Sequence, residues 1–306
     1  MPNRDTGQRA FDHAARLHCY GRSMGDKLPE SVPLGPRSVL GRIVTDPRIA
    51  FTGFATGLLQ IMHPAVSAGV IQHSGFFDDP FDRVYRSVPR IVATITSENG
   101  AARAVKVRDY HRDIKGLDAN GARYHALDPE VFWWTHMCFV WGFLTTAERF
   151  RHPRLRPGER EQFYAESVEW WRRYDLSMRF VPPDLASFLE DFDRRCATDL
   201  EWTEAAAAAL EVSTFRAPFP VPLDRVIGAP LTPVMRLAMI GTLPAPVRER
   251  FDLPWTRADR LAYASLTQAV SQGGRLLPAY PMQQVSTAFL KRLGARTSLA
   301  SEGVPA

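Results

Sequence analysis

The sequence predicts an all-α fold, and three observations support this prediction. Several long segments place apolar residues at helical spacing, for example Leu185, Phe188, Leu189 and Phe192. Proline, glycine or a capping residue stands where helices are expected to begin or end. Almost no stretch alternates polar and apolar residues with the period of two expected for strands. The chain has 306 residues, 45% hydrophobic and 23% charged, which suits a globular protein with a sizeable core.

The first third of the chain divides at prolines and glycines. Residues 1–40 are predicted to be irregular, because glycine and proline interrupt them repeatedly. A helix is expected from near Pro47, with a kink or restart at Pro64. Asp79 and Pro80 are expected to start the next helix. Residues 101–116 predict an amphipathic helix that ends at Gly116.

The remainder is also expected to be helical. A tight turn, a small hairpin, is predicted around Asn120-Gly121. After the helix at 131–147, further helices should follow Pro157-Gly158, Asp184 and Thr203. Residues 216–233 are rich in proline and predict an extended connector, with two or three more helices from 233 to about 293. The domain organisation is therefore predicted as a 1–40 segment, one domain at 41–295 and a flexible 296–306 tail.

The most informative segment is Val131–Ala147, in which no residue carries a full charge. Asp128 is a suitable N-cap and Pro129 suits the first helical position, so the segment predicts a buried central helix. His136 lies in its middle, among tryptophans and phenylalanines. A neutral imidazole in such surroundings is either a core residue with a local hydrogen bond or a metal ligand.

Composition and motifs exclude several classes of protein. The net charge is +5, but the arginines are scattered, so no nucleic-acid-binding surface is predicted. Cys19, Cys138 and Cys196 are far apart and form no CxxC pair, which disfavours zinc ribbons, iron–sulfur clusters and covalent c-type haem. HExxH, GxSxG, P-loop, GxGxxG and Glu-x-x-His motifs do not occur. Cys138 is expected to be a packed thiol.

A cytoplasmic location is expected from the same features. The N-terminal residues lack the apolar core of a signal peptide, and widely spaced cysteines suit a reducing compartment. Residues 51–71 and 131–147 are apolar enough to be compared with membrane spans. Internal polar residues, including Gln60 and His63 in the first, favour buried helices of a globular domain. Peripheral membrane contact stays open.

Four motifs in order resemble one known family. They are LLQIMHPAVSAGVIQHSGFFDDPFDR, VRDYHRDIKG, GxxYHALDPE and WWTH, within residues 53–193. This order resembles the MpaB and latex-clearing-protein (rubber oxygenase) family. The resemblance implies an all-helical fold with a globin-like core, which holds non-covalent haem b and uses it for oxygenase chemistry.

The resemblance also assigns roles to individual residues. It implies that His136 is the proximal iron ligand and that Arg108 is the distal arginine. His111 stands where the rubber oxygenases have a lysine over the iron, so it could be a second axial ligand. Arg108 and His111 are three residues apart and are expected on one helix face, near bound dioxygen. The alternative is that both join a surface network with Asp109 and its neighbours.

Other residues are weaker candidates. Arg83, Arg86 and Arg90 would share one helix face and could pair with the haem carboxylates, although a solvated face explains them nearly as well. His63, which precedes Pro64, is expected to have a structural or supporting role near the haem. His125 is the rival of His111 as the distal group.

Three functions are compatible with these residues. The first is a haem b oxygenase or other oxidoreductase of the MpaB class, with a small or medium apolar substrate, dioxygen and an unspecified electron donor. Arg108 and His111 would be its catalytic residues. The second is a non-catalytic haem sensor or electron carrier with two histidine ligands. The third is a metal-free helical protein that binds apolar ligands. The sequence does not indicate an oligomeric state.

Overall fold

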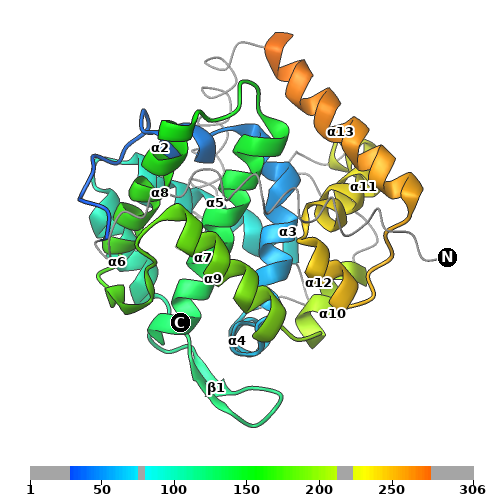
Figure 1. The fold of residues 1–306 in the computed structure, drawn as a ribbon. Coiled ribbons are helices and arrows are strands. Elements are labelled where there is room, and N and C mark those ends of the chain that lie inside the picture. The colour runs from blue at the N-terminus through cyan, green and yellow to red at the C-terminus, as the bar shows by residue number, and fades with distance from the viewer. Residues whose placement is uncertain (1–27, 75–79, 212–222, 277–306) are drawn as a thin grey trace, which may run out of the picture.

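The computed structural model describes residues 28–74, 80–211 and 223–276, and these residues are mostly helical (Figure 1). Within them, one two-stranded antiparallel sheet accompanies the helices. The all-α prediction is therefore confirmed. The predicted tail at 296–306, the cap at Asp79 and most of the 1–40 segment lie outside the described residues.

The N-terminal helices are short and sharply bent. Their bounds are α2 Val39–Val44, η1 Pro47–Ile49, α3 Ala50–Ile61 and α4 Pro64–His73. The predicted break at Pro64 is confirmed, because α4 begins there and η1–α3 meets α4 at 98°. Proline suits the first position of α4, where its missing N–H has no helical acceptor to reach. Helix α2 was not predicted, since only six residues form it.

A hairpin follows the next pair of helices. The bounds are α5 Pro80–Thr96, α6 Gly100–Asp109, β1 Lys115–Leu117 and β2 Arg123–His125. The predicted turn at Asn120-Gly121 is confirmed, with Gly121 at a positive φ of 78° that glycine adopts easily. The predicted end of α6 at Gly116 is wrong, because the chain leaves the helix after Asp109. Residues from Lys115 onward instead pair with β2, which requires an extended backbone.

The central helix and its neighbours have the bounds α7 Pro129–Thr145, η2 Thr146–Phe150, α8 Pro157–Arg172, η3 Met178–Phe180 and α9 Leu185–Thr198. The predicted start of α7 is confirmed, since the Asp128 side chain accepts a hydrogen bond from the Glu130 N–H and Pro129 is the first helical residue. Asp184 likewise caps α9 by accepting from the Ser187 N–H at 2.8 Å. Figure 1 shows α7 in the middle of the molecule.

The last helices are α10 Glu204–Glu211, α11 Leu223–Thr242, α12 Ala245–Arg250 and α13 Arg257–Leu276. The prediction of an extended connector over 216–233 is wrong from Leu223 onward, where α11 begins. Helix α11 packs against α3 and α13, and burial of its apolar residues offsets the cost of internal proline. Helix α13 lies on the outside of the molecule (Figure 1).

The core is built around α7. Twelve of its residues are buried, and it packs against α3, α8 and α2. Helix α2 is attached to α8 by one buried carboxylate: Glu166, 1% exposed, accepts hydrogen bonds from the N–H groups of Val39 and Leu40 at 3.1 and 2.6 Å. These two donors belong to the first turn of α2, where no helical carbonyl can reach them.

The described helices can be compared with the length and apolar character of a membrane span. Within the described residues, no single helix combines the length and apolar character that a bilayer span needs, whereas the bent pair Pro47–Ile61 and Pro64–His73 passes that test jointly.

Close contact between α3 and α7 leads to a first prediction. A methyl group on Gly142 would overlap with the side chain of Thr56, whereas one on Gly53 would meet nothing within 4 Å. We expect Gly142→Ala to lower the free energy of unfolding by about 2 kcal/mol. Gly53→Ala, in exposed α3 surface, should raise it by roughly 0.5–1 kcal/mol. Urea denaturation measures both, and equal effects would show that α3 and α7 are not in close contact.

Candidate functional site

His136 lies inside the protein, on the face of α7 that packs against α8. Its exposed fraction is 3%, and its Nε2 is 3.2 Å from the backbone oxygen of Ser167 in α8. A carbonyl can only accept, so Nε2 carries the proton and donates it. The other ring nitrogen, Nδ1, therefore has a lone pair, and it has no hydrogen-bond partner within the described part of the chain.

Aromatic rings surround the His136 imidazole. Their centroids lie at 4.4 Å for Trp170, 5.2 Å for Trp171, 5.3 Å for Trp133 and 6.2 Å for Tyr174. Two of these rings come from the pair Trp170-Trp171 on α8. We refer to His136 and these four residues as the aromatic cluster. It places an apolar, flat-sided environment around one basic nitrogen.

Burial determines the charge of His136. Desolvation lowers its pKa to about 3, and the hydrogen bond to Ser167 opposes this only partly. The imidazole is therefore neutral at neutral pH, which is the state that binds a metal. A ligating histidine usually donates its second ring N–H to a carbonyl or carboxylate, as His136 does to Ser167.

These properties fit a haem ligand. An unpartnered, buried lone pair on a neutral imidazole suits iron that arrives with four porphyrin nitrogens, and aromatic side chains suit the porphyrin faces. Nδ1 is also shielded by the aromatic cluster. A planar group of this size would therefore require the surrounding rings to shift.

Arg108 is engaged in contacts with the end of α8. Its Nε donates to Asp109 at 2.9 Å, and its Nη1 donates to the backbone oxygens of Tyr174 and Asp175 at 3.1 and 3.3 Å. It also contacts the Asp175 carboxylate at 3.2 Å. Hydrogen bonding to Asp109 raises the pKa of Arg108. The contact with Asp109 matches the surface-network alternative, and Tyr174 connects Arg108 to the aromatic cluster.

His111 lies beyond the end of α6, so the prediction that it shares a helix with Arg108 is wrong. Its Nδ1 is 2.8 Å from the backbone oxygen of Val107, and its ring meets the ring of Phe132 edge-on at 5.4 Å. Phe132 in turn contacts Trp171 and Tyr174, which contact His136. The structure thus places aromatic rings between His111 and His136 and does not bring the two imidazoles together.

His125, the rival distal residue, lies in β2. Its Nε2 is 2.9 Å from the backbone oxygen of Arg112, so it joins the base of the hairpin to the turn after α6. None of its described contacts is with the aromatic cluster.

His63 occupies the N-cap position of α4, at the 98° bend. Burial lowers its pKa, while Asp199 acts in the opposite direction. Its Nδ1 is buried without a hydrogen-bond partner in the described residues, and its ring lies 6.4 Å from that of Trp134. The described ring contact of His63 is therefore with Trp134 rather than with His136.

The three arginines proposed for the haem carboxylates lie on α5. The side chains of Arg83 and Arg86 are outside the described part of the structure. Arg90 is exposed and holds its guanidinium 5.6 Å from the centre of the Tyr110 ring. That contact is a cation–π interaction on the surface.

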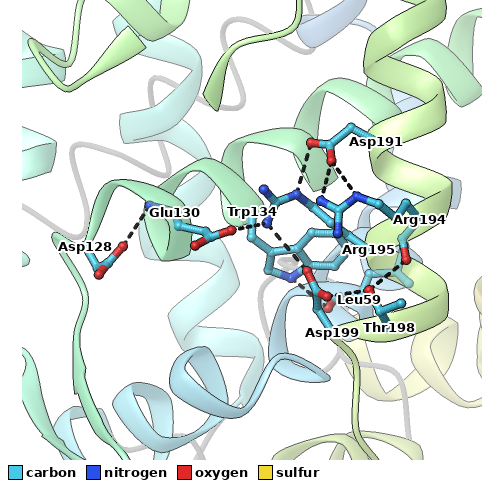
Figure 2. A network of polar contacts seen from close by, with 9 residues as sticks. All are labelled: Leu59, Asp128, Glu130, Trp134, Asp191, Arg194, Arg195, Thr198 and Asp199. Carbon is cyan, nitrogen blue, oxygen red and sulfur yellow. Dashed lines mark hydrogen bonds and ion pairs between the residues drawn. The ribbon is translucent and has the colours of Figure 1, made fainter. Parts of the chain in front are cut away.

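An ion-pair network around one buried arginine, which the sequence did not predict, joins α7 to α9 (Figure 2). Its centre is Arg195, whose side chain is 4% exposed and contacts Glu130, Asp191 and Asp199 at 3.2, 3.0 and 3.5 Å. Nearby, the Trp134 indole N–H donates to the backbone oxygen of Leu59 at 3.2 Å. Arg194 precedes Arg195 directly, and no sequence pattern indicates which of the two arginines is buried. The network fixes the start of α7, and with it the helix that carries His136.

The expectation that Cys138 is a packed thiol is confirmed. Cys138 and Cys196 are both buried, free thiols, and burial raises the pKa of each above its ordinary value. Cys19 lies outside the described residues.

Comparison with known protein families gives a match over most of the chain. The model of a family described as "ER-bound oxygenase mpaB/B'/Rubber oxygenase, catalytic domain" matches residues 41–272. This range is 232 of the 306 residues (272 − 41 + 1) and contains both the predicted motifs and the aromatic cluster. Searches of curated proteins and of solved structures found no match.

Proposed function

The chain belongs to the family of mpaB and rubber oxygenase catalytic domains, and from this premise we propose that it is a haem b-dependent oxygenase. The substrate in this proposal is a small or medium apolar organic molecule, and the co-substrate is dioxygen. Membership of the family supports an oxygenase. The dependence on haem and the class of substrate are parts of the proposal.

The observation that carries the haem proposal is the unpartnered Nδ1 of His136. It is a buried lone pair on a neutral ring, fixed by the hydrogen bond from Nε2 to Ser167. His136 would bind the iron, and the haem would supply the oxygen chemistry. Trp133, Trp170 and Trp171 would exclude water and pack against apolar surfaces. Tyr174, whose pKa burial raises, stays protonated beside them.

Haem content and oxygen incorporation test this proposal. The purified full chain should show a Soret band, and acidified organic solvent should extract the haem because no CxxC attachment motif exists. Reaction of an apolar alkene with isotopically labelled dioxygen should place the label in the product. The protein without haem, reconstituted with zinc protoporphyrin instead of hemin, is the control. A chain that binds no added hemin would overturn the proposal.

The role of His111 is a separate prediction. Because its Nδ1 contacts Val107 and Phe132 separates its ring from the aromatic cluster, we expect His111→Ala to leave the resting ferric spectrum nearly unchanged. Because Phe132 lies between His111 and the aromatic cluster, azide affinity should fall by less than the ~1 kcal/mol, roughly fivefold, that loss of a hydrogen bond to the bound ligand would cost. Absorbance titration with azide measures this.

The control for that titration is Arg112→Ala, since this side chain is 62% exposed. A change from a low-spin to a high-spin spectrum in His111→Ala alone would mean that His111 binds the iron. Such a result would favour the sensor or electron-carrier function with two histidine ligands.

A further inference from the structure

Four tryptophans are fully buried, and only one has no acceptor for its indole N–H among the described residues. Trp134 donates to the Leu59 oxygen at 3.2 Å, Trp170 to Thr94 Oγ1 at 2.8 Å and Trp171 to the Ser177 oxygen at 3.2 Å. The Nε1 of Trp133 has no such partner, although the residue is 1% exposed. Buried donors are nearly always hydrogen-bonded, so Trp133 requires an explanation.

The unpartnered donor lies beside the unpartnered acceptor. Trp133 precedes His136 by three residues on α7, so the two share one face of the helix. Their rings are stacked, with centroids 5.3 Å apart and planes 25° apart. Nε1 of Trp133 can donate and Nδ1 of His136 can accept or bind a metal, and each is shielded from solvent. Two unsatisfied groups of complementary chemistry thus occur on adjacent rings.

We propose that Trp133 is a ligand-binding residue, whose indole N–H donates a hydrogen bond to an oxygen atom of the group that binds at His136. This inference rests on the proposed function. The acceptor in this proposal is a carboxylate oxygen of the porphyrin, because the Trp133 ring stacks on the ring that would hold the iron and so lies on the same side of the porphyrin as His136. A carboxylate would satisfy a donor that has no partner among the described residues.

The ring of Trp171 contacts both residues that carry these nitrogens, Trp133 and His136. Trp171 meets Trp133 edge-on at 4.9 Å and His136 at 5.2 Å, so it touches both. Its own N–H is held by Ser177, near η3 and outside α8. Trp171 therefore contacts both residues of the proposed site, and its own N–H is hydrogen-bonded to a residue outside α8.

The test compares Trp133→Phe with Trp134→Phe in the full chain. Trp134 is the matched control, because it is the next residue of α7, is equally buried, and already has an acceptor in Leu59. Absorbance titrations give the Kd for hemin and for iron etioporphyrin, which has no carboxylates. Formate titration of the hemin-loaded proteins is a further control, since a small ligand of the iron should not reach Trp133.

We expect Trp133→Phe to weaken hemin binding about tenfold and to leave the binding of iron etioporphyrin and formate nearly unchanged, while Trp134→Phe changes each less than about twofold. A loss with hemin but not with iron etioporphyrin assigns the acceptor to a porphyrin carboxylate. A loss in formate affinity alone overturns this assignment. Equal losses for both porphyrins with unchanged formate binding indicate lost packing alone and overturn the inference, as does no loss at all.

A second measurement, on the wild-type protein, tests the inference even if the Trp133→Phe protein does not fold. Ultraviolet resonance Raman spectra of the wild-type protein should show one indole N–H gaining a hydrogen bond when hemin is added. An unchanged indole N–H band overturns the inference. If the wild-type protein binds no hemin, the proposed function fails; if it binds hemin and Trp133→Phe has no effect, only the role of Trp133 fails.

Discussion

We expect the His136→Ala protein to fold and to lose more than about 100-fold in hemin affinity. Removing even a supporting partner of a metal ligand costs about 10–100-fold, so loss of the ligand itself should cost more. No other histidine lies on α7, and the rings of His111 and His63 contact other groups. Absorbance titration measures the affinity, and added imidazole should restore part of the Soret spectrum by entering the space that the side chain leaves.

Two further variants show whether a loss of hemin affinity is due to the loss of the His136 nitrogens. His136→Phe keeps an aromatic ring in the cluster and removes both nitrogens, so it should fold well and still bind no hemin. His73→Ala is the control, because His73 is exposed and its hydrogen bond in the described part of the chain is with the Lys115 backbone oxygen, at 3.2 Å. If His136→Phe retains the wild-type Soret band, another residue binds the iron.

The second large effect is expected at Arg195. Arg195→Met keeps much of the volume but leaves Glu130, Asp191 and Asp199 without the cation that they share. Removing one member of a buried ion pair costs about 3–5 kcal/mol, and partial exposure of the three carboxylates places our expectation near 3 kcal/mol. Urea denaturation measures this loss of stability.

The neighbouring residue provides the comparison. Arg194 pairs with Asp191 at 2.5 Å, but its side chain is 54% exposed. Arg194→Met should therefore change the free energy of unfolding by less than about 1 kcal/mol. Similar losses for the two variants would show that the Arg195 network does not hold α7 to α9.

Local signals predicted much of the fold. Asp128-Pro129, Asp184 and Asn120-Gly121 act through their own backbone geometry, and each has the predicted role in the structure. The incorrect predictions concern segments whose secondary structure depends on contacts with residues far away in the sequence. Pairing with β2 ends α6 early, and packing against α3 and α13 makes α11 helical through a proline-rich sequence. Neither contact can be read from residues close in sequence.

The candidate site was predicted only in part. The apolar surroundings of His136 follow from its own helix, and the structure places it in the core. Its shell depends on which residues of α8 face α7, and Trp170, Trp171, Tyr174 and the Ser167 oxygen could not be assigned to it beforehand. The contacts of Arg108 could not be predicted either, because its position in the sequence does not reveal that the backbone oxygens of Tyr174 and Asp175 accept its hydrogen bonds.

The attachment of α2 to Glu166 has a consequence for synthesis on the ribosome. The N–H groups of Val39 and Leu40 depend on a carboxylate that is 127 and 126 residues further along the chain. At about 5–20 residues per second, that residue is added roughly 6–25 s after α2. During this interval the apolar residues Val39, Leu40, Ile43 and Val44 lack the surface of α8 against which they pack. The first described helix in the sequence is therefore expected to form only after α8 has been synthesised, and until then to be a site for chaperone binding.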